Sequence, residues 1–569
     1  MSAETINGAR IVLETLHRLG VTDMFGYPGG AVIPIYDEIY SFPEIKHYFV
    51  RHEQGAAHAA DGYARVSGKV GVCLATSGPG ATNLVTGIMT AYMDSVPMVA
   101  ITGQVGRALI GKDSFQEADI QGITMPITKH NYLVQDIHDL PRIIKEAYFI
   151  AGTGRPGPVL IDIPKDIQTE KISMTEYNKL YDVPIQLEGY DPTYKGHQGQ
   201  IKKAATLIKN AKRPLIIAGA GVLKSGAMAE LKALAEKAQI PVANTLVGLG
   251  GFPGNHELAL GMVGMHGTVA ANNCTEDADL VIAAGIRFHD RITGHPDFFC
   301  KKAKIIHIDI DPAEIDKNVT INVPIVGDLK RVLTELNTFV EPTTHESWIA
   351  QIREWQQEYP MVVPKSIHGE LHPQYVLSEL NKIAKDDAII VTDVGQHQMW
   401  AAQFLTHKAP HTIVTSGGAG TMGYGLPAAI GAQVGAPNKQ VILVVGDGGF
   451  QMTCEELMMV RQYNLPIKIV IINNGYLGMV RQWQQIFNDR RYSYVDLEVS
   501  PDFLKLADAF DLKAARFDSV ETFNKDFKSY ITSDESIVLD CRVEREDNVL
   551  PMIPAGGTVS GMMGKKGVL

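Results

Sequence analysis

The sequence predicts an α/β protein made of three domains, each built on a doubly wound parallel sheet. Its 569 residues suit this architecture, because domains usually contain roughly 100–200 residues and the chain can therefore form about three separate cores. Short apolar, β-branched runs recur from end to end and alternate with helix-like stretches. Continuous apolar strands with helical crossovers are typical of parallel sheets that are covered on both faces.

The predicted strands fall into three groups along the chain. They are 71–75, 98–101 and 159–163 in the first group, 214–218, 280–284 and 305–310 in the second, and 388–392, 441–445, 467–472 and 537–539 in the third. Polar segments rich in Pro, Tyr, Gly or charge separate the groups. We therefore expect domains of residues 1–185, 186–345 and 346–569. The last domain ends in a Gly-rich tail that is either disordered or a lid.

The composition restricts the partners that we expect. The net charge is −11, so the chain gains nothing from releasing phosphate counterions, and we expect neither nucleic acid nor a membrane as a partner. The longest apolar runs have the length of a strand, far below a membrane span. The five cysteines are widely spaced and contain no CxxC pair, which argues against disulfides or a zinc site and indicates a cytoplasmic protein.

Polar residues follow two neighbouring predicted strands of the third domain. Strand 441–445 runs into Gly446-Asp447-Gly448-Gly449, and strand 467–472 runs into Asn473-Asn474. Because parallel strands end at a common edge, Asp447 and Asn474 are expected to lie close together. Their oxygens suit Mg²⁺ and leave positions for a diphosphate, while the glycines let backbone approach the phosphates. The alternative is an ordinary turn with an N-capping Asp.

A glutamate in the first domain also follows a predicted strand. Glu53 follows a predicted strand at 48–50 and opens a helix of small residues, where a charge is unusual. The alternative is a first-turn glutamate that the helix dipole favours. Residues 52–65 and 76–83 resemble the pyrimidine domain of thiamine-diphosphate enzymes, and the Asp447–Asn474 pattern resembles their magnesium–diphosphate signature. The resemblance implies that Glu53 hydrogen-bonds the cofactor's aminopyrimidine ring, and that it meets the diphosphate motif across a dimer interface.

Nearly the whole chain, from 25–30 to 550–557, resembles the catalytic subunits of acetolactate (acetohydroxyacid) synthases. The resemblance implies a pyrimidine-binding first domain, an FAD-associated central domain and a third domain that binds diphosphate and Mg²⁺. The implied catalytic residues are Glu53, Gly30, Gln116 and Lys165. The implied metal ligands are Asp447, Asn474 and the backbone carbonyl of Tyr476. The implied contacts with thiamine diphosphate are Glu53, Gly395, Gln396, His397, Met422, Gly446, Gly448, Gly449, Tyr476, Gly478 and Met479.

The central domain resembles the flavin-associated part of biosynthetic synthases. The implied FAD contacts are Arg155, Gly219, Gly264, Met265, His266, Gly285, Arg287, Asp290, Arg291, Asp309 and Asp328. The implied substrate pocket contains Phe115, Gln116, Arg291 and Trp483. His289 stands where the motif usually has an acidic residue, and Gly106 stands where proline is common. Without the resemblance, Met422 would be assigned to a core, Trp483 to packing, and Arg287 and Arg291 to a surface ion-pair loop.

The implied activity is the first common step of valine, leucine and isoleucine biosynthesis. The enzyme would decarboxylate pyruvate and condense the hydroxyethyl group with a second 2-keto acid. Pyruvate as acceptor gives 2-acetolactate, and 2-ketobutyrate gives 2-aceto-2-hydroxybutyrate. The expected assembly is a homodimer or a dimer of dimers with a small regulatory subunit. The alternatives are pyruvate oxidase, glyoxylate carboligase, a fermentative acetolactate synthase, or a non-catalytic regulator that binds the cofactors.

Overall fold

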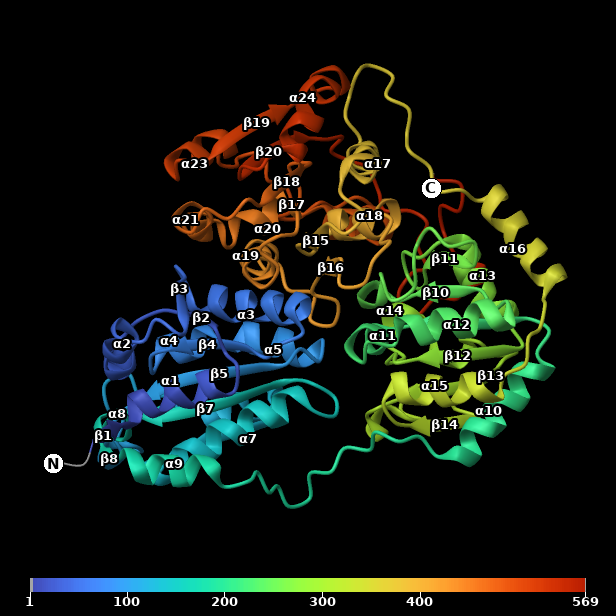
Figure 1. Cartoon of the computed structure of the whole chain (residues 1–569). Coiled ribbons are helices and arrows are strands. Elements are labelled where there is room, and N and C mark those ends of the chain that lie inside the picture. The colour runs from blue at the N-terminus through green and yellow to red at the C-terminus, as the bar shows by residue number, and fades with distance from the viewer. Residues whose placement is uncertain (1–3, 568–569) are drawn as a thin grey trace.

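A computed structural model describes residues 4–567 as three α/β units, each with a six-stranded parallel sheet (Figure 1). We call these the N-terminal, middle and C-terminal units. The outer ends of the first and third predicted domains, residues 1–3 and 568–569, lie outside the described part. Among residues 4–567, every helix falls short of the length and apolarity that a membrane span would need.

The N-terminal unit has the strand order β3-β2-β4-β5-β7-β6. Its strands are β2 (Asp23–Gly26), β3 (Lys46–Phe49), β4 (Gly71–Ala75), β5 (Met98–Gln104), β6 (His130–Leu133) and β7 (Pro158–Pro164), and β1 (Thr5–Asn7) pairs antiparallel with β8 (Lys171–Ser173). Its helices are α1 (Gly8–Arg18), α2 (Ile33–Tyr40), α3 (Glu53–Ser67), α4 (Pro79–Asn83), α5 (Val85–Met93), α6 (Ile120–Thr124), α7 (Leu140–Gly152), α8 (Lys165–Thr169) and α9 (Met174–Asp182).

The middle unit has the strand order β11-β10-β9-β12-β13-β14. Its strands are β9 (Pro214–Ala218), β10 (Val242–Asn244), β11 (Ala259–Met262), β12 (Leu280–Ala284), β13 (Lys304–Asp309) and β14 (Val323–Val326). Its helices are α10 (Gln198–Asn210), α11 (Ala220–Lys224), α12 (Met228–Ala238), α13 (Val269–Asp277), α14 (Asp290–Thr293), α15 (Leu329–Phe339) and α16 (Glu346–Glu358). Trp348 of α16 packs in the core of this unit, although the predicted boundary at 345/346 assigns it to the next domain. The domain boundaries themselves stay a prediction.

The C-terminal unit has the strand order β16-β15-β17-β18-β20-β19. Its strands are β15 (Ile389–Thr392), β16 (Ile413–Val414), β17 (Val441–Gly446), β18 (Lys468–Asn473), β19 (Lys513–Phe517) and β20 (Ile537–Arg542). Its helices are α17 (Pro373–Ile383), α18 (Gln396–Phe404), α19 (Gly425–Gly435), α20 (Asp447–Gln451), α21 (Leu457–Gln462), α22 (Gly478–Phe487), α23 (Phe503–Ala509) and α24 (Val520–Thr532).

Burial of the central strands on both faces explains why their sequences predicted them. Every residue of β4, β9, β12 and β17 is buried, and apolar side chains on opposite faces pack into different cores. The predicted parallel α/β fold is therefore confirmed. In the described part of the tail, Met552 and Met563 bridge each other and the Ile553 N–H donates to the Met265 carbonyl.

The N-terminal and C-terminal units meet where α3 packs against α19 (Figure 1). A Cβ atom built at Gly431 would lie 1.8 Å from the Ala59 carbonyl oxygen, and one at Gly62 would lie 2.1 Å from that of Ala428. The two helices therefore touch backbone to backbone, which only glycine permits at these positions. This contact fixes the relative position of the two sheets within one chain.

Replacing Gly431 with Ala should consequently destabilise the protein by about 3 kcal/mol or more, since overpacking against rigid backbone cannot relax through a side chain. Urea unfolding would measure the change. Gly152→Ala is the matched control in a helix, because its Cβ would meet only a Val70 methyl at 3.5 Å. Equal stability of the two variants would contradict the proposed close contact.

Candidate functional site

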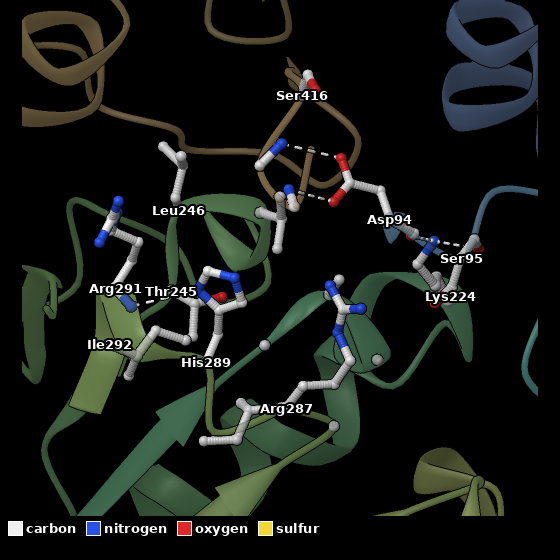
Figure 2. A pocket seen from close by; sticks show the side chains of 18 of the residues that line it. Asp94, Ser95, Lys224, Thr245, Leu246, Arg287, His289, Arg291, Ile292 and Ser416 are labelled. Atoms are coloured by element: carbon white, nitrogen blue, oxygen red, sulfur yellow. Dashed lines mark hydrogen bonds between the residues drawn. The ribbon is translucent and has the colours of Figure 1, made fainter. Parts of the chain in front are cut away.

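Two neighbouring cavities open at the carboxyl ends of the strands. The larger, of about 620 Å³, lies between the three units and falls in the size range of cofactor and small-molecule sites (Figure 2). The smaller, of about 60 Å³, lies at the edge of the C-terminal sheet. Both are lined by Val394, Gly395, Met422, Met479 and Val480. A ligand that fills one would therefore contact residues of the other.

The smaller cavity collects the residues predicted to bind diphosphate and metal. They come from the ends of β15, β17 and β18, from the loop between β16 and α19, and from α22. They are Gly395, Gln396, His397, Met422, Gly446, Asp447, Gly448, Gly449, Asn474, Tyr476, Gly478 and Met479. Burial lowers the pKa of His397 to about 3, so its imidazole is neutral at pH 7. Sequence positions far apart thus meet at one sheet edge, as the parallel pairing requires.

Asp447 fits a metal ligand. It is 1% exposed, and its Oδ2 atom has no hydrogen-bond partner among residues 4–567. Burial raises its pKa to about 7, which a nearby cation would reverse. The Asn474 Oδ1 atom accepts from the Tyr476 N–H at 3.1 Å. The described residues contain no group of three or more His, Cys, Asp or Glu placed to bind a metal, so a metal here needs amide and carbonyl oxygens as well.

Two glycines of the smaller cavity admit protein side chains that pack closely around it. A Cβ at Gly478 would lie 2.1 Å from Gln396 Oε1, and one at Gly449 would lie 2.3 Å from Asp393 Oδ1. Asp393 was not predicted. Its buried carboxyl accepts from the Gly423 N–H at 3.2 Å and the Gly425 N–H at 2.7 Å, and it thereby holds the loop that carries Met422.

Arg545 is a second residue that sequence reasoning missed. Its Nη2 donates to the Gly475 carbonyl at 3.1 Å and to Asp496 Oδ1 at 2.9 Å. Its guanidinium also lies 4.3 Å from the centre of the Tyr476 ring. These contacts fix the loop whose Tyr476 carbonyl is the predicted third metal ligand. About 70 residues separate Arg545 from this loop, so the contact becomes visible only once the chain is folded.

Cationic side chains surround the larger cavity (Figure 2). Arg155 pairs with Asp311 and Glu314, and Arg291 pairs with Asp290. The Arg287 guanidinium makes no hydrogen bond or ion pair within residues 4–567, and burial lowers its pKa. A half-buried guanidinium that no carboxylate in the described part of the chain pairs with is suited to an anionic ligand, so the cavity fits a group such as a diphosphate.

Lys224 closes the same cavity where the three units meet. Its ammonium donates to the carbonyl oxygens of Asp94 and Ser95 at 2.7 Å and 2.6 Å, and the Asp94 carboxylate accepts from the Gly417 and Gly418 N–H groups (Figure 2). Burial lowers the pKa of Lys224 to about 7. The three units are therefore joined by hydrogen bonds at one end of the cavity.

Most predicted flavin contacts line the larger cavity. They are Arg155, Gly219, Met265, His266, Gly285, Arg287, Arg291, Asp309 and Asp328. Gly264 and Asp290 stand outside the lining. Gly264 lies behind the wall, because its Cβ would meet the Arg291 carbonyl oxygen at 2.4 Å. His289 does line the cavity. Its Nδ1 accepts from the Arg291 N–H, and burial lowers its pKa, so an uncharged imidazole replaces the usual acid.

The predicted substrate residues separate into two places. Arg291 and Trp483 line the larger cavity, where Met479 and Val480 of α22 lie beside Trp483. Phe115 is 87% exposed, and neither it nor Gln116 lines either of these two cavities. The predicted catalytic residues Gly30, Glu53, Gln116 and Lys165 all belong to the N-terminal unit, where Gly30, Glu53 and Lys165 follow the ends of β2, β3 and β7.

Glu53 opens α3 and is 8% exposed. Asn83 Nδ2 donates to its Oε2 at 2.9 Å, and a Cβ at Gly80 would lie 3.0 Å from its Oε1. Glu53 lines neither cavity. Within one chain, the structure therefore does not bring this carboxyl to the Asp447 edge.

Comparisons with known proteins agree with this arrangement. Three thiamine pyrophosphate enzyme family models match: the N-terminal TPP binding domain at residues 6–123, the central domain at 201–336 and the C-terminal TPP binding domain at 393–541. The chain is 48% identical to an acetolactate synthase large subunit of Lactococcus lactis, over 98% of this chain and 96% of the relative.

The chain belongs to the acetolactate synthase large-subunit family. It is also 47% identical to an acetolactate synthase of Mycobacterium bovis over 100% of this chain and 93% of the relative. The large subunit of Pyropia yezoensis is 49% identical over 98% of this chain and 95% of its own length. Within this family of thiamine pyrophosphate enzymes, the smaller cavity is the place to test for the cofactor's diphosphate.

We expect Asp447→Ala to weaken magnesium-dependent binding of thiamine diphosphate more than roughly 100-fold, because even outer-shell partners of a metal commonly contribute 10- to 100-fold. Calorimetry with and without Mg²⁺ would measure it. Asp489→Ala removes an exposed carboxylate of the same unit as a control. Unchanged affinity in Asp447→Ala would refute the metal assignment.

Proposed function

We propose that this chain is the catalytic subunit of an acetolactate synthase, which decarboxylates pyruvate and joins the remaining two carbons to a second 2-keto acid. The observation that supports this most is the smaller cavity. It gathers a buried carboxylate, one oxygen of which has no partner among residues 4–567, an amide and a glycine-lined wall, and it adjoins a larger cavity that is lined by Trp483 and Arg287. The full-length similarity to acetolactate synthase large subunits supports the same function.

The C-terminal unit would hold the cofactor's charged end. Asp447, Asn474 and the Tyr476 carbonyl would bind Mg²⁺, and backbone at Gly395 and Gly448 would approach the diphosphate. Met422 lies in the lining that the two cavities share, where an apolar side chain can support the cofactor's bend. Bound thiamine diphosphate supplies the carbanion and the electron sink for decarboxylation.

Glu53 would hold the proton that the aminopyrimidine ring shares. Asn83 orients its carboxyl by donating to Oε2. Because Glu53 lines neither cavity, we propose that it serves a cofactor held by a second copy, so that the active unit is a homodimer. The relatives' designation as large subunits supports a small regulatory partner.

The larger cavity would hold FAD without net redox turnover. Arg287 offers an unpaired guanidinium for a diphosphate, and burial raises the pKa of Asp309 to about 6, at a strand end suited to a ribose. Trp483 and Arg291 would define the acceptor site, with the indole packing the acceptor's alkyl group and the guanidinium attracting its carboxylate.

The deciding experiment is identification of the product from pyruvate, with and without 2-ketobutyrate, in the presence of thiamine diphosphate, Mg²⁺ and FAD. The proposal requires 2-acetolactate alone in the first case and 2-aceto-2-hydroxybutyrate in the second. Acetate or acetyl phosphate, with bleaching of the flavin at the rate of turnover, would instead indicate a pyruvate oxidase.

Glu53→Gln should slow deuterium exchange at the cofactor's C2 by roughly 10²- to 10⁴-fold, the usual contribution of a positioned acid or base. Thiamine diphosphate affinity should stay near that of the wild type, because the metal and diphosphate contacts lie elsewhere. NMR of quenched samples measures the exchange. Exchange at the wild-type rate would remove Glu53 from the mechanism.

The purified protein should be yellow or bind added FAD, and Arg287→Met should weaken FAD roughly 10- to 100-fold. The loss corresponds to one charge-assisted contact of about 1.5–3 kcal/mol. Flavin fluorescence quenching gives the dissociation constant. Arg353→Met, which removes an exposed arginine from α16 of the same unit, is the control. Equal FAD affinity in both variants would contradict the role of Arg287.

A further inference from the structure

The chain entering α3 is held from the C-terminal unit. Glu456 is the last residue of a short 3₁₀ segment, Cys454–Glu456, which follows α20, and its side chain is fully buried. The Arg51 N–H donates to both oxygens of Glu456, at 3.0 Å and 3.1 Å, and the His52 N–H donates to Oε1 at 3.1 Å. These two N–H groups immediately precede Glu53. One buried side chain therefore fixes the turn from which the proposed catalytic carboxyl projects.

Gly55 makes this contact possible. It lies in the first turn of α3, where glycine costs about 1 kcal/mol of helix propensity relative to alanine. A Cβ atom at this position would lie 2.2 Å from Glu456 Oε1. Because the carboxyl is the end of a flexible side chain, an added methyl would displace it from the Arg51 and His52 N–H groups. Close packing of the Glu456 side chain thus explains why a glycine occupies this position in the helix.

Two further contacts join these units nearby without touching the turn. Tyr463 Oη accepts from the Phe49 N–H at 2.8 Å, and Arg51 Nη2 donates to Gln462 Oε1 at 2.7 Å. Both residues lie in or just after α21, which faces the end of β3 (Figure 1). They anchor the strand end and a side chain. Of the contacts between these two units that involve residues 4–567, the one made by Glu456 holds the backbone N–H groups that immediately precede Glu53.

We propose that Glu456 is a positioning residue for Glu53, acting through the Arg51 and His52 N–H groups. This inference rests on the proposed function, because it assumes that Glu53 activates thiamine diphosphate. It also means that the segment following Asp447 in the C-terminal unit sets the direction of a carboxyl in the N-terminal unit. A displacement of about 1 Å in such a group can cost roughly 100-fold in rate.

Glu456→Ala should slow C2 deuterium exchange in bound thiamine diphosphate roughly 10- to 100-fold. Thiamine diphosphate affinity should change little. Glu456→Gln keeps one carbonyl acceptor and should recover part of the rate. In the protein without added cofactor, amide hydrogen exchange of a peptide covering 49–56 should accelerate in Glu456→Ala, which reports the released turn independently of catalysis. Wild-type exchange in both measurements would overturn the proposal.

Gly55→Ala provides a test that leaves Glu456 in the sequence. It should slow C2 exchange like Glu456→Ala, because its methyl expels the carboxyl. In the Glu456→Ala background the same substitution should add nothing, since the space is then free; such non-additivity is the signature of a shared contact. Full additivity of the two effects would overturn the proposal.

Tyr463→Phe is the matched control, because it removes a hydrogen bond between the same two units but leaves the turn intact. Its C2 exchange should match that of the wild type. A loss equal to that of Glu456→Ala would show that any weakening of this contact between units has the same effect, and would overturn a specific role. Glu53→Gln separates the two hypotheses. Normal C2 exchange in Glu53→Gln would contradict the proposed function. Slow C2 exchange in Glu53→Gln together with normal C2 exchange in Glu456→Ala would contradict only the positioning role.

Discussion

The parallel pairing of strands that are buried on both faces constrains everything else in this molecule. Such strands leave no exposed face for chemistry, so polar residues gather where the strands end. The diphosphate and metal residues follow β15, β17 and β18, the predicted flavin contacts include residues that follow β9 and β12, and Glu53 follows β3. Three sheets built on one principle thus present three polar edges, of which the middle and C-terminal ones border the larger cavity.

The sequence predicted every interior strand except β2 and β10, and it missed every edge strand except β3, for a physical reason. A strand buried on both faces needs a continuous apolar run, which is visible locally. Edge strands such as β6 (His130–Leu133) and β19 (Lys513–Phe517) carry polar residues and obtain their conformation from a single neighbouring strand. The two-residue β16 has too few residues to show any periodicity.

The candidate site was predictable where function requires particular residue types next to a strand end. Asp447 and Asn474 are such residues, and the structure places both in the smaller cavity. Other residues of the site act through backbone groups that are distant in sequence, namely Asp393, Arg545 and Glu456. A hydrogen bond to a backbone group does not require a particular residue type at that position, so the sequence contains no pattern that predicts it. Gly55 was the one available signal for Glu456, yet a glycine in a helix of small residues does not reveal which side chain it admits.

The same backbone contacts that hold the units together explain why Glu53 and Asp447 stay apart within one chain. At Gly62 and Gly431, α3 and α19 approach too closely for any side chain, so the N-terminal and C-terminal sheets cannot rotate toward each other without breaking that contact. Glu456 adds a buried polar contact at the same junction. A rigid junction cannot bring Glu53 to the Asp447 edge of the same chain. It can, however, present that acid at a fixed angle to a second copy, which is why a defect at Glu456 should appear in proton transfer and leave cofactor affinity nearly unchanged.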